Sequence, residues 1–346
     1  MTSPSPTISP SSTSSFSSTR SKKKLSISDF LILSELGRGA YGKVLLVQSK
    51  KTQKKYAIKS IDKFFLDKLN KSHEALIEKE MLSKLDHKYL MKLIACFQNS
   101  QKLFFLMDYY KNGTLLDIIN NNGILPKQIA IFYLSQLLSV LEYFQQKHIA
   151  HRDLKPNNIL IDDNKHIKVI DFATCVYIGK VYDKTTKQFI TKEGNNINND
   201  DIIGTVEYAS PEMLNNKVEN EKSCDIWALG VIMYQMFHGF TPFKGNCHND
   251  IVANIKEGSY TMREDLDESC KDLIGKLLQY DVDKRIGMKD INEIKSHVFF
   301  EGVDFDNIEY PDEPCPYKVF KLKSDSTLVK VDVNEKVNKK ELVVFS

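Results

Sequence analysis

The sequence of 346 residues lacks the features of several large classes of protein. No apolar run approaches the roughly 20 residues that a membrane-spanning helix needs, and there is no secretory signal. The six cysteines are scattered and include no C-x-x-C pair, which argues against a zinc site or a disulfide framework and favours a reducing compartment. We therefore expect a cytoplasmic protein without a transmembrane segment.

Acidic residues are also missing from the start of the chain, where Asp29 is the first. Most of the first twenty residues are Ser or Thr, a composition that cannot bury a core. A transit peptide is disfavoured because such peptides are Arg-rich and amphipathic. We expect residues 1–26 to be a solvated, disordered tail. The net charge of the whole chain, +3, gives no reason to expect nucleic acid or an anionic membrane as a partner.

The hydrophobic pattern divides the remaining chain into a β-rich part and a helical part. One helical pattern lies at 74–85, and a small antiparallel sheet is predicted with strands at 30–36, 44–48, 55–61, 93–97 and 103–107. An apolar face at three-to-four spacing follows Pro126 and predicts a long helix. The segment 181–201 is polar and is expected to be a loop. The fold class is therefore α+β.

Two motifs carry the strongest chemical signal. His151-Arg152-Asp153-Leu154-Lys155-Pro156-Asn157-Asn158 contains one carboxylate, at Asp153, and a carboxamide at Asn158, and Asp171-Phe172-Ala173 adds a second carboxylate. Transfer of a phosphoryl group from a nucleotide needs such groups, because a carboxylate takes the proton of the acceptor hydroxyl and oxygen ligands hold magnesium on the phosphates. The two motifs together indicate phosphoryl transfer.

A glycine-rich run, Gly37-Arg38-Gly39-Ala40-Tyr41-Gly42-Lys43-Val44, lies between the first two predicted strands. Glycines let backbone N–H groups approach phosphate oxygens without an intervening side chain. The same spacing occurs in dinucleotide-binding folds and in plain hairpins. A dinucleotide loop should open a helix, whereas here a second strand follows, which favours a phosphate-binding hairpin within the sheet.

Lys59 lies on the next predicted strand, in Tyr56-Ala57-Ile58-Lys59. The helical pattern at 74–85 offers it two carboxylates, Glu78 and Glu80. Two residues of separation places these about 200° apart around a helix, so only one of them can face the lysine. We expect the partner to be Glu78.

These motifs together resemble those of eukaryotic protein kinases, with Ala173 in place of the usual glycine of the Asp-Phe-Gly motif. Lys155 and the closing run His297-Val298-Phe299-Phe300 favour the serine/threonine kinases of the AGC group. Within that group the sequence is most similar to the 3-phosphoinositide-dependent protein kinase family. Three further segments resemble the end of the activation segment and two parts of the helical lobe: Gly204-Thr205-Val206-Glu207-Tyr208-Ala209-Ser210-Pro211-Glu212, Asp225-Ile226-Trp227-Ala228-Leu229-Gly230 and Asp283-Lys284-Arg285-Ile286-Gly287.

The resemblance implies the bilobal eukaryotic protein kinase fold. Residues 27–306 would form the kinase domain. Its small lobe, 27–108, would hold a five-stranded antiparallel sheet and one major helix, and its larger lobe, 109–306, would be mainly helical. Residues 307–346 would be a C-terminal tail. No phosphoinositide-binding domain is expected in this chain, because the family's pleckstrin-homology domain needs roughly 100 residues.

The resemblance also implies roles for individual residues. Catalytic residues would be Asp153, as general base, with Lys155 and Thr205; Mg²⁺ would be held by Asn158 and Asp171; and structural roles would belong to Asp225 and to the pair Glu212 and Arg285. ATP would contact Leu36, Gly37, Arg38, Gly39, Ala40, Tyr41, Gly42, Lys43, Val44, Ala57, Lys59, Glu78, Met107, Asp108, Tyr110 and Leu160.

The implied activity is transfer of the ATP γ-phosphate to protein Ser or Thr hydroxyls, on the activation loops of other AGC kinases. The family captures these substrates by their C-terminal hydrophobic motif, in a groove beside the helix of the small lobe. Asp201 stands where the family carries an activating phosphoserine, as a fixed charge or simply as part of a polar loop. Leu342-Val343-Val344-Phe345-Ser346 has the spacing of a truncated hydrophobic motif, which would dock in the protein's own groove or fray. The groove would involve Lys63, Leu66, Gln98 and Leu103.

Ala173 leaves a second hypothesis open, a pseudokinase or scaffold with impaired turnover. Glycine at that position permits a positive φ and the peptide flip that reorients Asp171, whereas Ala restricts both. If the active state needs only a negative φ at Ala173, the substitution is harmless. A kinase of small molecules is disfavoured by Thr205, Ser210-Pro211-Glu212 and Arg285, which build a platform for a peptide.

Overall fold

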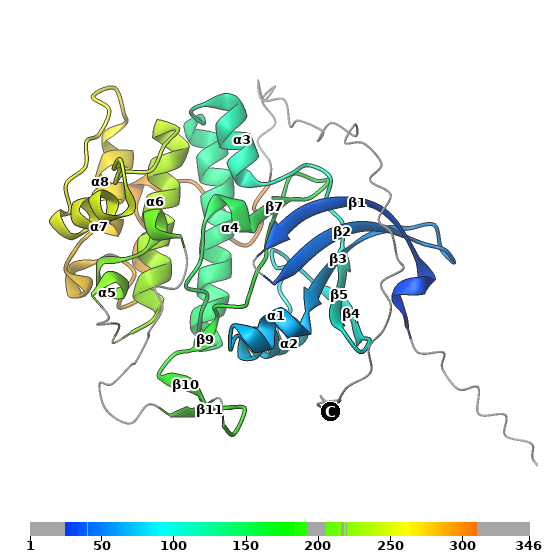
Figure 1. The fold of residues 1–346 in the computed structure, drawn as a ribbon. Coiled ribbons are helices and arrows are strands. Elements are labelled where there is room, and N and C mark those ends of the chain that lie inside the picture. Colours follow the sequence, from blue (N-terminus) through cyan, green and yellow to red (C-terminus); the bar gives the residue numbers. More distant parts are fainter. Residues whose placement is uncertain are drawn as a thin grey trace, which may run out of the picture.

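The β-rich part of the chain forms one antiparallel sheet of five strands, as predicted (Figure 1). The structure, a computed structural model, describes residues 25–39, 41–183, 185–191, 205–215, 218 and 220–309. The spatial order is β1-β2-β3-β5-β4, and the strands are β1 (Phe30–Gly39), β2 (Gly42–Ser49), β3 (Lys55–Asp62), β4 (Leu93–Gln98) and β5 (Lys102–Asp108). Several predicted features lie outside the described residues: the tail up to residue 24, Ala40, Asp201, Gly204 and the segment from residue 310 to the end, with Leu342-Val343-Val344-Phe345-Ser346.

The two faces of the sheet are covered differently. One face carries a small apolar cluster of its own, formed by Phe30, Leu45, Val47, Ile58, Phe97, Phe104 and Leu106. The other face joins the main core through Ile61 and Phe105, together with apolar residues of α2 (Ser72–Lys84). A short helix that the sequence did not predict, α1 (Lys63–Lys68), precedes α2. It begins where the Asp62 carboxylate accepts a hydrogen bond from the Phe64 N–H group.

Helices build the larger lobe, with α4 and α6 in its interior (Figure 1). Every residue of α6 after Lys222 is buried, so this helix is enclosed on all sides. α4 begins directly after Pro126, as predicted, and α6 ends where Gly239 adopts a φ of 79°. The helices are α3 (Leu115–Asn122), α4 (Lys127–Gln146), α5 (Pro211–Leu214), α6 (Lys222–His238), α7 (His248–Glu257), α8 (Glu268–Leu277) and α9 (Asn292–Lys295).

Short strands and turns lie at the junction of the two lobes, where they frame the predicted catalytic residues. β6 (Ile149–Ala150) pairs with β9 (Val176–Tyr177), and β7 (Ile159–Ile161) pairs with β8 (Ile167–Val169). The run from His151 to Asn158 therefore connects β6 with β7, and Asp171 follows β8. Five single turns of 3-10 helix complete the fold: η1 (Ile27–Asp29), η2 (Pro156–Asn158), η3 (Val206–Tyr208), η4 (Val282–Lys284) and η5 (Val298–Phe300).

The prediction of a polar loop over residues 181–201 is wrong in its first half. Residues Lys180–Asp183 (β10) and Gln188–Thr191 (β11) form an antiparallel hairpin. Tyr182 and Phe189 lie opposite each other in its register, and both are partly buried against the main core. Two aromatic residues in a polar stretch are too few to produce an alternating pattern, yet they are enough to attach the hairpin to the protein.

The predicted pairing of Glu212 with Arg285 is present and lies deep in the helical lobe. The Arg285 guanidinium donates to both Glu212 carboxylate oxygens, at 2.7 and 3.1 Å. It also donates to the carbonyl oxygens of Ser223 and Gln279, and it lies 5.0 Å from the ring of Trp227. Burial tends to raise the pKa of Glu212, but the hydrogen bond and charge of Arg285 outweigh burial and lower it. The pair fixes the end of the activation segment to the helices behind it.

Trp227, the one tryptophan, is a core residue, as expected. Its ring stacks on Phe243 at 5.5 Å. The five described cysteines are free of disulfide bonds. Among the described residues, no helix combines the length and the apolar character needed to cross a membrane.

Replacing Arg285 with Met should destabilise the protein, because the Glu212 carboxylate would stay buried without its partner. We expect the free energy of unfolding in urea to fall by about 3–5 kcal/mol. Lys284→Met is the matched control, since Lys284 is exposed and pairs only with Asp281, at 3.2 Å. This control should change stability by less than ~0.5 kcal/mol. Equal losses in the two variants would contradict the role of the buried pair.

Candidate active site

The catalytic loop is held by a carboxylate from α6. Asp225 accepts hydrogen bonds from the backbone N–H groups of His151, at 2.7 Å, and Arg152, at 2.8 Å. Arg152 has a φ of 66°, in the left-handed region that a residue with a Cβ adopts rarely. Burial raises the pKa of Asp225, and these two N–H groups oppose that rise. The predicted structural role of Asp225 therefore has a direct geometric basis.

Three predicted catalytic residues, with Asn158, meet around one carboxylate. The Lys155 ammonium lies 2.8 and 3.0 Å from the Asp153 oxygens and donates to Thr205 Oγ1 at 2.7 Å. The Thr205 N–H group donates to Asp153 Oδ1 at 3.2 Å, and Asn158 Nδ2 donates to Asp153 Oδ2 at 3.0 Å. All these partners are donors, as an ionised carboxylate requires. Asp153 is thus arranged as an acceptor.

A small hollow lies beside this carboxylate. Its lining combines the catalytic loop with the segment after Thr205 and with α6. The lining residues are Arg152, Asp153, Leu154, Thr205, Tyr208, Ala209, Met213, Cys224 and Ala228. The hollow therefore separates the catalytic loop from the segment after Thr205 beside the Asp153 carboxylate.

Lys59 connects the sheet to both α2 and the Asp171 segment. Its ammonium lies 2.6 and 2.8 Å from the Glu78 oxygens and 3.1 Å from Asp171 Oδ1. Glu80 instead pairs with Lys84 at 2.7 Å. The expected choice of Glu78 over Glu80 as the partner of Lys59 is therefore confirmed.

Electrostatics keep this triad charged at Lys59 and Asp171. Burial tends to lower the pKa of Lys59, but the Glu78 and Asp171 carboxylates outweigh it and raise the pKa. Burial tends to raise the pKa of Asp171, but the charge and hydrogen bond of Lys59 lower it below the ordinary value. Burial raises the pKa of Glu78, and Lys59 opposes that rise.

The Asp171-Phe172-Ala173 motif is compatible with its alanine in this structure. The positive φ belongs to Asp171, at 65°, and Ala173 has a negative φ. Phe172 is buried, with its ring 5.6 Å from that of His151. The backbone seen here therefore does not need glycine at position 173.

The three glycines of the first hairpin, Gly37, Gly39 and Gly42, differ in the space that a Cβ atom would find. A Cβ atom on Gly42 would lie 2.0 Å from the carbonyl oxygen of Ser60 on β3, so the close approach of two strands requires glycine there. Positions Gly37 and Gly39 have open space where a Cβ would point. Gly37 and Gly39 therefore leave the free surface that phosphate binding would use, and Gly42 has a further steric reason to be glycine, the packing of β2 against β3.

The other predicted nucleotide contacts are distributed along the sheet and the lobe junction. Ala57 and Met107 lie opposite each other on β3 and β5, and both are buried. Tyr110 and Leu160 are partly buried against the main core, and burial raises the pKa of Tyr110 to about 12. Asp108 pairs with Lys54 at 3.0 Å.

The remaining predicted nucleotide contacts lie in the hairpin of β1 and β2. Glu35 pairs with Arg38 at 3.0 Å and with Lys43 at 3.8 Å, a contact that sequence reasoning missed. Leu36 is exposed and Tyr41 packs partly against the main core. Val44 lies opposite Lys59 in the register of β2 and β3, so the hairpin leads directly to the lysine.

The donor set fits a divalent metal carried on a nucleotide. Lys59 engages Asp171 Oδ1, and Asn158 uses Nδ2 toward Asp153, so Asp171 Oδ2 and Asn158 Oδ1 remain as oxygen donors. The described residues contain no group of three His, Cys, Asp or Glu side chains able to hold a metal alone. Magnesium does not need one, because it binds through one or two protein oxygens plus phosphates and water.

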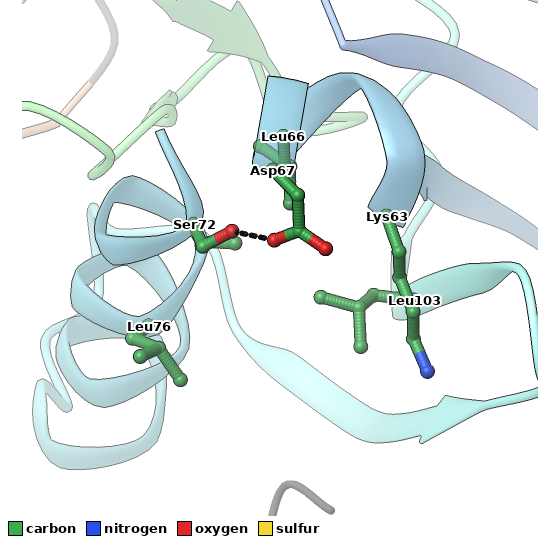
Figure 2. A pocket seen from close by; sticks show the side chains of 7 residues that line it. Lys63, Leu66, Asp67, Ser72, Leu76 and Leu103 are labelled. Atoms are coloured by element: carbon green, nitrogen blue, oxygen red, sulfur yellow. Dashed lines mark hydrogen bonds between the residues drawn. The ribbon is translucent and has the colours of Figure 1, made fainter. Parts of the chain in front are cut away.

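A second hollow lies between α1, α2 and β5, where the docking groove was expected (Figure 2). Three of the four predicted residues line it, namely Lys63, Leu66 and Leu103. Gln98 lies opposite Leu103 in the register of β4 and β5 but is exposed and does not line the hollow. The rest of the lining is Asp67, Ser72, Ala75 and Leu76, and the Ser72 hydroxyl donates to the Asp67 carboxylate (Figure 2).

Two contacts of the catalytic motif were not predicted individually. Arg152 Nε donates to the Thr174 carbonyl oxygen at 2.9 Å, and the His151 ring lies 3.1 Å from the Ile170 carbonyl oxygen. Both residues belong to the contiguous motif from His151 to Asn158. Their place in that motif was the only sequence signal for a functional role. They join the catalytic loop to the segments on each side of Asp171.

Comparison with known proteins places this geometry in a family. The model of the protein kinase domain matches residues 30–300. The chain is 36% identical over 289 residues to 3-phosphoinositide-dependent protein kinase 1 of Homo sapiens, covering 83% of this chain and 50% of that protein. It is likewise 36% identical to the putative 3-phosphoinositide-dependent protein kinase 2 of Homo sapiens, covering 83% of this chain and 70% of that protein.

A third relative is the cAMP-dependent protein kinase type 3 of Saccharomyces cerevisiae, 33% identical over 298 residues, with 84% of this chain and 70% of that protein covered. The chain spans about half the length of the 3-phosphoinositide-dependent protein kinase 1 sequences that it matches. Proteins of this family use ATP and a divalent metal. The chain belongs to the protein kinase family, as a serine/threonine kinase domain of the AGC group.

Proposed function

We propose that this protein is an active serine/threonine protein kinase that transfers the γ-phosphate of magnesium-bound ATP to protein hydroxyls. The observation that carries the proposal is the simultaneous assembly of two groups of contacts. One joins Lys59 to Glu78 and Asp171, and the other joins Asp153 to Lys155 and Thr205. Together they bring the proposed nucleotide-binding and proton-accepting side chains into one site, the arrangement that catalysis by positioning requires.

Each of these side chains would have a distinct task. Asp153 would accept the proton of the substrate hydroxyl, because its carboxylate is ringed by donors and lies beside the hollow. Lys155, between Asp153 and Thr205, would face the transferred phosphate. Lys59 would bind nucleotide phosphates, oriented by Glu78. Asn158 and Asp171 would hold Mg²⁺, which when bound supplies positive charge for the phosphates.

The substrates we propose are the activation loops of other AGC kinases. Two observations support this proposal: the 36% identity to 3-phosphoinositide-dependent protein kinases, and the hollow between α1 and α2. Leu66, Leu76 and Leu103 give that hollow an apolar lining suited to the side chains of a hydrophobic motif. We place the protein in the cytoplasm, with residues 27–306 as its catalytic domain.

The alternative of a pseudokinase rests on Ala173. Glycine would be required if its φ were positive, and in this structure it is negative. The steric argument against turnover therefore does not apply to this conformation. Catalysis is the better-supported reading, and the two variants below separate it from the alternative.

Asp153→Asn should abolish most activity, because the carboxamide keeps the shape of the side chain but cannot take a proton. We expect incorporation of radiolabelled phosphate from ATP into an acceptor protein to fall by at least about a hundredfold. Asp163→Asn is the control, since this exposed residue contacts Lys111 at the surface. Equal incorporation by wild type and Asp153→Asn would favour the pseudokinase.

Ala173→Gly should leave kcat within about twofold of wild type, because the backbone here does not use the freedom of glycine. The free energy of unfolding should fall by roughly 0.4–1 kcal/mol, since glycine gives the unfolded chain more conformations. Steady-state kinetics and urea unfolding measure both effects. A gain of tenfold or more in kcat, which corresponds to about 1.4 kcal/mol of activation free energy, would show that Ala173 restrains catalysis.

Leu103→Glu tests the docking hollow, because a carboxylate is poorly accommodated among apolar side chains. We expect kcat/KM for a kinase substrate with a hydrophobic motif to fall by about tenfold or more, with kcat/KM for a short peptide unchanged. Ile94→Glu, at an exposed position of β4, is the control. An equal loss with both substrates would mean damage to the fold, and no loss with either would exclude docking at this hollow.

A further inference from the structure

Two aromatic residues of the β10–β11 hairpin, Tyr182 and Phe189, pack with Tyr177 of β9. Tyr182 and Phe189 lie opposite each other in the hairpin register, with ring centroids 5.2 Å apart and planes at 79°. Tyr177, on β9, meets Phe189 at 4.8 Å with planes at 89°. Edge-to-face pairs of this kind are favourable beyond the area they bury. The three rings form a cluster, which we call the hairpin cluster.

The hairpin cluster lies against α2. Tyr182 stacks on the His73 ring with centroids 6.1 Å apart. The Tyr177 hydroxyl donates to Glu80 Oε1 at 3.2 Å, and the Lys84 ammonium lies 5.8 Å from the Tyr177 ring. In Figure 1 the hairpin extends from β9, near the end of the sheet lobe that carries α1 and α2. Segments far apart in the sequence are thus joined at one helix face; Tyr177 and Glu80 are 97 residues apart.

The contacted residues of α2 form a single stripe. His73, Glu80 and Lys84 are separated by seven and four residues, which places all three within about 40° around the helix. Glu78 is five residues from His73 and about 140° away from it. One side of α2 therefore meets the hairpin cluster while another side presents Glu78 to Lys59. Any rotation or shift of α2 would break both sets of contacts together.

Within the part of the chain that the structure describes, no side chain caps the start of α2. It starts at Ser72 without a side-chain hydrogen bond to its first N–H groups. Its Ser72 hydroxyl is turned to Asp67 on α1. The hairpin cluster supplies contacts along the helix that the helix start does not provide.

We propose that the hairpin cluster is a positioning element that holds α2 where Glu78 meets Lys59. Tyr177 and Tyr182 contact α2, and Phe189 supports both of them, so the hairpin cluster acts on phosphate binding through α2. This inference rests on the proposed kinase function, because the Lys59–Glu78 contact matters for turnover only if the protein transfers phosphate. It adds a determinant of activity that lies in the segment after Asp171.

Kinetics of single variants test the positioning role. Tyr182→Ala and Phe189→Ala should each lower kcat by about two- to tenfold, the factor that one aromatic pair contributes, with KM for the acceptor peptide unchanged. Tyr182→Phe keeps the ring and should restore wild-type kcat. Ile190→Ala is the matched control, because Ile190 is the neighbour of Phe189 on β11 and is 45% exposed. Its kcat should equal that of wild type.

Amide hydrogen exchange of α2 gives a readout that does not depend on activity. Exchange in Ser72–Lys84 should be faster in Tyr182→Ala and Phe189→Ala than in wild type or Ile190→Ala. If wild type phosphorylates substrate while both alanine variants keep wild-type kcat and exchange, the positioning role is wrong and the kinase function stands. If wild type is no more active than Asp153→Asn, the kinase function fails, and unchanged exchange would overturn the positioning role independently.

Discussion

The contact between Lys59 and Glu78 is the interaction on which the rest of the site depends. Glu78 is buried, and a buried carboxylate is unfavourable unless a cation and hydrogen bonds offset its loss of water. Lys59 provides both, at 2.6 and 2.8 Å, and it also reaches Asp171. One ammonium thus joins the sheet, α2 and the segment after β8. Because a displaced Glu78 would lose its partner entirely, α2 has one favourable position instead of a range of intermediate ones.

The helical lobe contains two further buried carboxylates that are held by hydrogen-bond donors. Asp225 secures the backbone of Arg152 in a conformation with positive φ, and the Glu212–Arg285 pair secures the end of the activation segment. Each is a buried charge with several donors, so each is specific in geometry and unfavourable to break from one side. Asp153, Lys155 and Thr205 lie between these two attachments. The catalytic loop is therefore held by hydrogen bonds to buried carboxylates, in addition to its apolar contacts such as those of Leu154 and of the His151 ring with Phe172.

Contiguous motifs made most of the site predictable, since residues that act together in the catalytic loop are also neighbours in the sequence. The partner of Lys59 followed from helix geometry, because Glu78 and Glu80 cannot face the same way. Features set by tertiary packing were missed. The β10–β11 hairpin depends on Tyr182 meeting α2 and on Phe189 packing against Tyr182, and no local pattern shows these contacts. For Gly42, the sequence did not reveal the close approach of its backbone to Ser60 on β3, which is a second reason for glycine there.

Ala173 and the hairpin cluster each restrain one of the two carboxylates that contact Lys59. Ala173 restricts the backbone next to Asp171, and the hairpin cluster restrains the helix that carries Glu78. A flipped Asp171 or a displaced α2 would each remove one carboxylate from Lys59. Restraint at both ends raises the free energy of those alternatives relative to the assembled site, and about 1.4 kcal/mol is enough for a tenfold change in their populations. These contacts are made by unmodified side chains, so they do not depend on phosphorylation of the protein itself. An assembled site is therefore the resting state that these residues favour.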